Sequence, residues 1–142
     1  MRRTKAKVAD VVKRVTKVIR TEKLQKVLTI AYVIVILYIT VFSRIPGSER
    51  IFKGLFWEYR NGMWNNILLN TLLFLPLGFL LGNKNGIIVG FLISLGVEAI
   101  QYIGLLGFCE IDDVLNNTIG TMLGVSFRMV IQKIMNHSLE SS

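Results

Sequence analysis

The sequence has almost no cysteine, the residue whose disulfides stabilise many small secreted proteins. Cys109 is the only cysteine among 142 residues, so no intrachain disulfide can form and the redox compartment cannot be read from cysteine usage. A small apolar residue at a membrane surface is a simpler interpretation of Cys109 than a reactive thiol. His137 is the only histidine, and it lies near the C-terminus. The chain therefore offers no disulfide scaffold.

Apolar residues are abundant instead. Hydrophobic side chains make up 52% of the sequence, and the mean hydropathy of +0.53 is too high for an ordinary soluble domain. Four apolar stretches each approach the ~20 residues that a helix needs to cross a ~30 Å hydrocarbon core. The sequence predicts an all-α membrane protein, with a four-helix membrane domain at 27–134 and spans at about 25–43, 65–82, 87–106 and 113–132.

Positive charge gathers at the N-terminus. Residues 1–26 contain ten lysines or arginines and two acidic residues, whereas the rest of the chain has seven of each kind. Because basic residues concentrate on the cytoplasmic side of a membrane, we expect the N-terminus and the tail at 135–142 to be cytoplasmic, in a bacterial plasma membrane. Valines at helical spacing predict that residues 1–26 form an amphipathic helix on the anionic inner leaflet. Nucleic acid is not needed as a partner to explain this charge.

The segment at 43–64 has a different character from the spans. Apolar and aromatic residues alternate with charges, and both tryptophans, Trp57 and Trp64, lie within it. Aromatic rings of this kind sit at the level of the lipid head groups. The pattern predicts an outer interfacial or partly re-entrant helix between the first two spans. An ordinary aromatic belt is the simpler interpretation, and a lid that contacts a ligand is the alternative.

Small residues recur on single faces of the predicted spans. Gly86, Gly90, Ser94 and Glu98 are spaced by four, so they share one helix face, and the fourth span contains a GxxxG pair. Such residues allow close helix packing in membranes. A proline inside the second span removes one helical hydrogen bond and predicts a kink. The residues to which we assign helix-packing roles are Pro76, Gly78, Gly90, Gly120 and Gly124.

Helix packing does not explain the carboxylates and amides in the same stretches. At ~1.5 Å per residue, Asn70, Glu98 and Asn117 all lie in the outer half of their spans. Polar groups at this depth usually face a bundle interior or a wet cavity. We expect an outward-facing cavity, and the alternative is a sealed structural network. The candidate ligand-binding residues are Asn66, Asn70, Glu98, Gln101, Glu110, Asp112, Asp113, Asn116 and Asn117.

The acidic residues have no basic neighbour in the sequence, because residues 87–113 contain neither lysine nor arginine. A raised pKa could keep some carboxyls neutral, or an outer-loop cation such as Arg44, Arg50 or Arg60 could pair with them. A bound hard cation such as Ca²⁺ or Mg²⁺ is a third solution. The sequence gives no ligand geometry, so we expect neither a metal nor another cofactor.

Three motifs resemble the VanZ-like family of small bacterial membrane proteins. They are NILLNTLLFLPLGFLLG, the pair Glu98-x-x-Gln101 and EIDDVLNNTIGTMLG, and together they cover residues 65–124. Members of this family often carry an arginine just before the acidic cluster, where this chain reads Gly107-Phe108-Cys109. The resemblance implies low-level resistance to teicoplanin and related lipid-bearing glycopeptides, without rewriting of the cell-wall precursor. The characteristic residues of the family map onto Pro76, Gly78, Glu98, Gln101, Glu110, Asp112, Asp113, Asn117 and Gly120.

Three classes of function fit these observations. The leading hypothesis is a protein that binds an amphipathic envelope lipid or a lipoglycopeptide. The second is an intramembrane enzyme that acts on a cell-wall or membrane lipid, with Glu98 and Asp113 as acid and base. Against the enzyme, Ser94 lies one turn deeper than Glu98, and no histidine is near the cavity. The third is a structural subunit of an envelope complex, and the sequence leaves open a homo-oligomer.

Overall fold

The computed structural model describes residues 22–47 and 51–140, so nearly all of the basic segment at 1–26 lies outside the described residues. Three helices are long and apolar enough to cross a membrane, at 22–42, 64–81 and 85–103. The elements in chain order are α2 (Glu22–Leu37), η1 (Tyr38–Phe42), β1 (Ile51–Lys53), α3 (Trp57–Arg60), α4 (Trp64–Leu81), α5 (Asn85–Ile103), β2 (Phe108–Glu110) and α6 (Ile111–Glu140).

The helices confirm an all-α membrane protein in its main features. Many large apolar side chains face outward from the bundle, among them Ile34, Leu69, Ile88 and Phe127, each more than half exposed. Lipid, rather than water, accommodates such a surface. The expected fourth span at 113–132 falls within the 30 residues of α6, which is not among the three helices that length and composition mark as spans. A fourth span therefore stays a prediction.

Glycines let α4 and α6 touch backbone to backbone. A Cβ atom built on Gly120 would lie 2.1 Å from the carbonyl oxygen of Thr71, and one on Gly124 would lie 2.0 Å from that of Leu75. The contact is reciprocal, because a Cβ on Gly78 of α4 would lie 2.1 Å from the Thr121 carbonyl oxygen of α6. No side chain fits at these distances. Small residues therefore set the separation of the two helices.

The α5 helix packs on the same pair through its own small-residue face. A Cβ on Gly90 would lie 2.4 Å from Oγ1 of Thr121, and Gly86, Ser94 and Glu98 are buried along with it. On α4, Pro76 lies inside a helix that continues from Trp64 to Leu81. The predicted kink at this proline stays a prediction.

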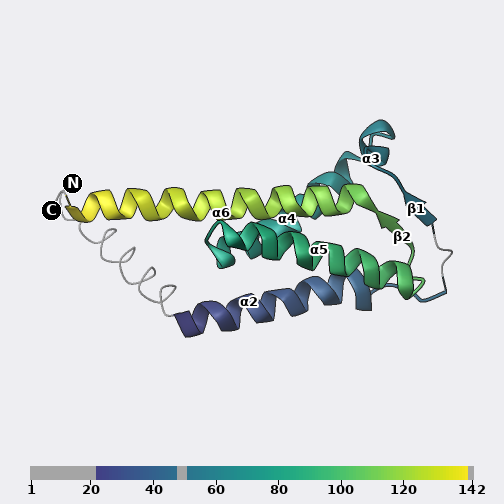
Figure 1. Cartoon of the computed structure of the whole chain (residues 1–142), viewed down its shortest axis with the longest axis horizontal. Helices are drawn as coiled ribbons and strands as arrows, with labels where there is room; N and C mark the ends of the chain where they lie inside the picture. The colour runs from purple at the N-terminus through teal and green to yellow at the C-terminus, as the bar shows by residue number, and fades with distance from the viewer. Residues whose placement is uncertain (1–21, 48–50, 141–142) are drawn as a thin grey trace.

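One end of the bundle carries the short elements β1, α3 and β2, at 51–53, 57–60 and 108–110, and we call it the strand end. Figure 1 shows that α2 and α5 run toward this end and that α6 starts there and runs back. The strands are parallel, with Ile51 opposite Phe108 and Lys53 opposite Glu110. The described part of the segment at 43–64 therefore contains a strand and a four-residue helix rather than one interfacial helix. The local pattern could not indicate the strand, because β1 pairs with β2, which lies more than 50 residues further along the chain.

At the other end of α4, Arg128 of α6 satisfies the last carbonyl groups of the helix. Its Nη1 donates to the carbonyl oxygens of Phe79 at 3.0 Å and Leu80 at 2.9 Å, and its Nη2 donates to Oε1 of Gln25 at 3.0 Å. Carbonyls in the last turn of a helix have no partner within the helix. The guanidinium supplies one and also joins α2 to α4 and α6.

Candidate functional site

Buried polar side chains gather at the strand end. Glu58 and Asn116 are 0% exposed, and Asp112 is 1% exposed. They come from α3 and from the first turns of α6, which the β1–β2 pair holds next to each other. Polar groups buried to this degree require hydrogen-bond or ionic partners. The partners define what the site can do.

Asp112 organises the chain between β1 and α3. One carboxylate oxygen accepts the backbone N–H of Phe56 at 2.6 Å, and the other accepts the N–H of Glu58 at 2.8 Å. Phe56 has a φ of 63°, in the left-handed region, which is unfavourable for a residue other than glycine. The two hydrogen bonds offset this cost and begin α3. Asp112 is therefore fully engaged with the backbone, and it shapes the site.

Lys53 supplies the positive charge that the sequence near the acidic cluster lacks. Its Nζ lies 2.6 Å from Oε1 of Glu110. The same Nζ lies 3.5 Å from the ring centroid of Trp57 and 3.6 Å from that of Phe108, so the ammonium group is held between two aromatic faces. Sequence reasoning missed this residue, although an isolated lysine among aromatic residues was a usable signal.

The arginines considered from the sequence do not pair with Glu110. Nη1 of Arg44 donates to the carbonyl oxygen of Leu106 at 3.3 Å, and Arg60 is exposed at the end of α3. Arg50 lies outside the described residues. The ion pair of the acidic cluster in the described part of the chain is thus made by β1, through the residue directly opposite Glu110.

Glu58 is the second residue that sequence reasoning missed. Its Oε2 accepts a hydrogen bond from Nδ2 of Asn116 at 3.0 Å, and the hydroxyl of Tyr59 donates to Oδ1 of the same asparagine at 2.5 Å. Burial raises the pKa of the Glu58 carboxyl above its ordinary value of 4.5, and the negative charge of Glu110 raises it further. Asn66, exposed at the start of α4, lies beside this carboxyl and favours its ionised form.

Other predicted site residues join the helices to one another. Nδ2 of Asn70 on α4 donates to Oδ1 of Asp113 on α6 at 2.5 Å. Nδ2 of Asn117 on α6 donates to Oγ of Ser94 on α5 at 2.8 Å. Nε2 of Gln101 donates to the backbone carbonyl of Thr40 in η1 at 2.9 Å. These contacts join the helices, but Oε1 of Gln101 and Oδ1 of Asn117 are buried without a hydrogen-bond partner in the described part of the chain. The amides therefore satisfy the sealed-network alternative only in part.

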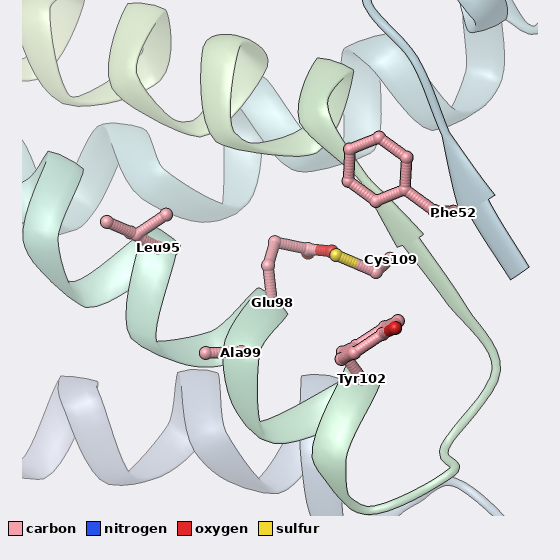
Figure 2. Close-up of a pocket in the computed structure, with 6 residues that line it drawn as sticks. All are labelled: Phe52, Leu95, Glu98, Ala99, Tyr102 and Cys109. Atoms are coloured by element: carbon pink, nitrogen blue, oxygen red, sulfur yellow. The ribbon is translucent and has the colours of Figure 1, made fainter. Parts of the chain in front are cut away.

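Glu98 takes part in the buried hydrogen-bond network and also lines a surface pocket. Its Oε2 accepts the backbone N–H of Glu110 at 2.9 Å, which fixes α5 to β2. Its side chain also lines an open pocket of about 360 Å³, drawn in Figure 2 with the sulfur of Cys109 beside the Glu98 carboxyl. Burial raises the pKa of the Cys109 thiol, and the negative charge of Glu98 adds to the shift. The pocket is lined by Phe52, Leu95, Glu98, Ala99, Tyr102 and Cys109.

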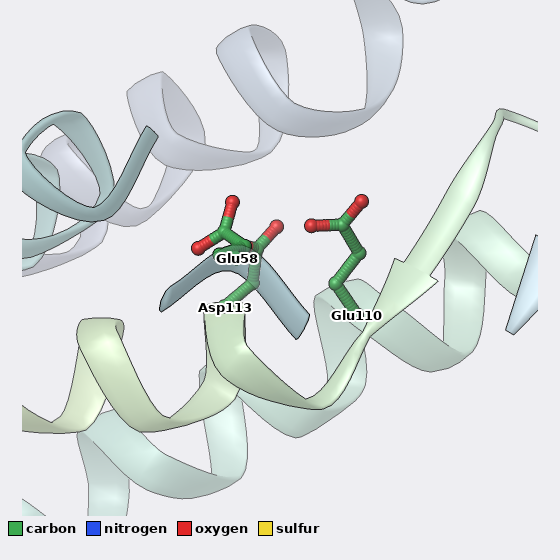
Figure 3. Close-up of side chains that lie close together, drawn as sticks. All are labelled: Glu58, Glu110 and Asp113. Atoms are coloured by element: carbon green, nitrogen blue, oxygen red, sulfur yellow. The ribbon is translucent and has the colours of Figure 1, made fainter. Parts of the chain in front are cut away.

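Three carboxyl groups lie close together at the strand end. One carboxylate oxygen from each of Glu58, Glu110 and Asp113 lies within 4.8 Å of the other two, and Figure 3 draws the three side chains close together. Oxygen-rich arrangements of this kind suit hard divalent cations. This group is the arrangement in the described part of the chain that could hold a metal ion.

Comparison with known proteins identifies relatives of this chain. A family model described as VanZ/LLP1 matches residues 29–132. The chain is 36% identical over 83 residues to a protein named Protein VanZ from Enterococcus faecium, an alignment that covers 53% of this chain and 51% of that protein. The chain thus matches about half the length of this relative. No solved structure matches this chain.

Proposed function

Because this chain belongs to the VanZ-like family, we propose that it binds an amphipathic envelope lipid or lipoglycopeptide at the strand end and confers low-level resistance of the teicoplanin type. The strand end faces the outside of a bacterial plasma membrane in this proposal, and both termini are cytoplasmic. Residues 1–26, with their ten basic side chains, bind the anionic inner leaflet. The observation that carries the proposal is the pocket beside Glu98.

The chemistry of this pocket suits a ligand with an apolar part and a polar part. Phe52, Leu95 and Ala99 offer apolar contact, while the Glu98 carboxyl offers an acceptor for an amine, amide or hydroxyl group of the ligand. The pocket is open rather than enclosed, so an acyl chain can enter it from the lipid that surrounds α5. Sites of this kind combine apolar walls with a small number of orienting polar groups.

The polar residues divide into two roles under this proposal. Glu98 lines the pocket and contacts the ligand, and the partly exposed Asp113 and Asn70, which are hydrogen-bonded to each other, offer further polar groups at the strand end. Asp112 and Asn116 are fully buried and hydrogen-bonded to α3, so they hold the site in shape. Replacing a residue of the second group should reduce folding, whereas replacing one of the first should reduce binding.

A matched pair of substitutions on α5 tests the pocket. Leu95→Trp places a large ring in the pocket, whereas Leu92→Trp makes the same change one turn earlier, at an exposed position that does not line it. We expect Leu95→Trp and Glu98→Gln to weaken binding of a fluorescent lipoglycopeptide to protein in nanodiscs and to raise teicoplanin sensitivity at equal membrane levels. Leu92→Trp should retain both properties. Equal binding by all three variants would contradict the proposal.

The same experiment separates ligand binding from a purely structural role. The buried network favours the structural role as a second candidate, because most of its hydrogen bonds join one element of the chain to another. A structural subunit would lose assembly in the Asp112→Asn variant and show no specific loss in Leu95→Trp. The two roles thus predict opposite orders of severity for these variants.

The native cysteine tests the orientation. Cys109 lies at the strand end and is the only thiol of the chain. Because this thiol reacts slowly at neutral pH, the labelling is done at mildly alkaline pH with a long incubation. A membrane-impermeant maleimide should then label Cys109 in intact cells whose cell wall admits the reagent. A Cys109→Ser/Asn136→Cys variant, whose new thiol is exposed near the C-terminal end of α6, should be labelled only after lysis. The reverse pattern would overturn the proposed orientation.

A further inference from the structure

The carboxylates of Glu58, Glu110 and Asp113 come together from three different elements. Glu58 is on α3, Glu110 ends β2 and Asp113 lies in the first turn of α6. One carboxylate oxygen from each lies within 4.8 Å of the other two, and the three side chains lie close together in Figure 3. Three like charges at this spacing repel one another, and the repulsion is relieved either by protonation of a carboxyl or by a positive group between them.

The Glu58 carboxyl has an oxygen that the protein leaves without a donor. Glu58 is 0% exposed, and its Oε1 has no hydrogen-bond partner in the described part of the chain, whereas its Oε2 accepts from Asn116. A buried acceptor without a partner is unfavourable by roughly 1–3 kcal/mol, and by more for a charged group. The Glu110 carboxyl lies within hydrogen-bond reach of the Glu58 carboxyl, so either a proton shared by the two or a further positive group belongs at Oε1.

The local charge also calls for a positive group. Lys53 pairs with Glu110 through Oε1, and a carboxylate has a second oxygen with which to bind another partner. Asp112 is not available to this cluster, because both its oxygens accept backbone N–H groups. The charge of Arg44 also acts on Asp113, although its Nη1 donates to the carbonyl oxygen of Leu106 rather than to a carboxylate. With Lys53 counted as the ion-paired cation, the three clustered carboxylates in ionised form keep two negative charges, which one divalent cation neutralises.

We propose that Glu58, Glu110 and Asp113 bind a divalent cation of the size of Ca²⁺. Ca²⁺ binds oxygen at about 2.3–2.6 Å, so opposite ligand oxygens lie up to about 5 Å apart, whereas the roughly 2.0–2.1 Å of Mg²⁺ allows only about 4 Å. The three oxygens lie within 4.8 Å of one another, which is inside the range that Ca²⁺ spans, and Ca²⁺ also accepts the more variable coordination geometry. Asp113 is only half-buried, and water enters the coordination sphere from its side.

The cation would hold α3, β2 and α6 together, because each of these elements supplies one of its ligands. Glu110 also holds Glu98 through its backbone N–H, so an ion at Glu110 stabilises the wall of the pocket in Figure 2. This role does not depend on the identity of the pocket ligand. Cation binding is measured on the protein alone, so its failure would leave the ligand-binding proposal standing.

Terbium luminescence tests the site on the full chain in detergent micelles after treatment with a chelator. Tb³⁺ replaces Ca²⁺ at oxygen sites, and Trp57, whose ring stacks on the Lys53 ammonium beside Glu110, can transfer excitation to it. We expect saturable emission that Ca²⁺ displaces at lower concentration than Mg²⁺. Glu58→Gln and Asp113→Asn should each weaken binding by about tenfold or more. Glu22→Gln, at the exposed start of α2, serves as the matched control and should bind as the native chain does.

A thermal unfolding series with added Ca²⁺ provides the second readout. The melting temperature of the native chain and of Glu22→Gln should rise with Ca²⁺, and that of each cluster variant should not, because a ligand that binds only the folded state stabilises it. Circular dichroism identifies which of Glu58→Gln and Asp113→Asn remain helical. One variant that stays folded is enough for the comparison with the native chain. Absence of terbium emission, or equal binding by a folded cluster variant, would overturn the proposal and indicate that Glu58 and Glu110 share a proton instead.

Discussion

Lys53 and Glu110 face each other across the parallel pair of β1 and β2, and their side chains form an ion pair at 2.6 Å. Both side chains are largely buried, with 11% and 8% exposed. The lysine also stacks on Trp57 and Phe108. A single lysine thus fastens both strands to the aromatic segment that precedes α4.

Removal of this lysine should destabilise the protein strongly. Lys53→Gln leaves the Glu110 carboxylate buried without its counter-ion, and the loss of one partner of a buried pair costs about 3 kcal/mol. We expect a lower melting temperature in detergent micelles. The double variant Lys53→Gln/Glu110→Gln should recover part of the loss, because it removes the uncompensated charge. A double variant less stable than Lys53→Gln would show that the pair is not the main interaction of Lys53.

Replacement of Asp112 by asparagine should loosen the start of α3. The asparagine side chain offers one oxygen, and its NH₂ group would face one of the two N–H donors, of Phe56 or of Glu58. A donor left without an acceptor costs about 1–3 kcal/mol. We expect faster proteolysis of the 51–60 segment and a lower melting temperature. The exposed Glu22→Gln change is the control and should alter neither.

A methyl group at Gly124 should disrupt the bundle, whereas one at Gly96 should not. The Cβ of Gly124→Ala would lie 2.0 Å from the Leu75 carbonyl oxygen, and that of Gly96→Ala meets no atom within 4 Å. Overpacking of this kind costs typically about 1–3 kcal/mol, whereas alanine in a helix is favoured over glycine by about 0.5–1 kcal/mol. Thermal unfolding of both variants provides the measurement. Equal stability would mean that α4 and α6 separate more easily than their contact suggests.

The thiol of Cys109 should react slowly at neutral pH. Only the thiolate is nucleophilic, and burial together with the charge of Glu98 raises the pKa of Cys109 above its ordinary value of 9.0. At any pH below that value, a smaller fraction of the thiol is ionised than in a free cysteine. The rate of alkylation in micelles should therefore reach half its maximum at a more alkaline pH than that of an exposed thiol.

The Glu98→Gln variant separates the two causes of this shift. Loss of the negative charge lowers the pKa of Cys109 again, so alkylation at pH 8 should be faster than in the native chain. The Cys109→Ser/Asn136→Cys variant supplies the exposed thiol for comparison. An unchanged rate in Glu98→Gln would assign the shift to burial and to the charges of Asp113 and Glu110, against the proximity of Glu98 and Cys109 in Figure 2.

The helices could be predicted from the sequence because their signals are local. The second predicted span, 65–82, nearly coincides with α4 at Trp64–Leu81. The third, 87–106, overlaps α5 at Asn85–Ile103, which ends one residue before Gly104. Length and hydropathy suffice for such segments, since a helix makes its backbone hydrogen bonds within itself. The alignment of Gly86, Gly90, Ser94 and Glu98 follows from helical period alone, and all four are buried.

The site could be predicted only in part. The acidic and amide residues of α5 and α6 were evident, because such groups are rare in apolar sequence. Lys53 and Glu58 were missed, since they lie in a segment whose pattern indicated an interfacial helix. Their roles depend on the pairing of β1 with β2, two three-residue strands that are distant in the sequence. No local pattern specifies such a partner.

The sequence by itself determined the solvent and the family of this protein. Its apolar runs require lipid, and its motifs are those of the VanZ-like family. Only the tertiary structure decided which groups pair with the carboxylates. Backbone N–H groups pair with Asp112 and a lysine pairs with Glu110, whereas one oxygen of Glu58 has no hydrogen-bond donor in the described part of the chain. The physical reason is that composition fixes how much charge must be neutralised, whereas the register of distant segments fixes which atoms can reach it.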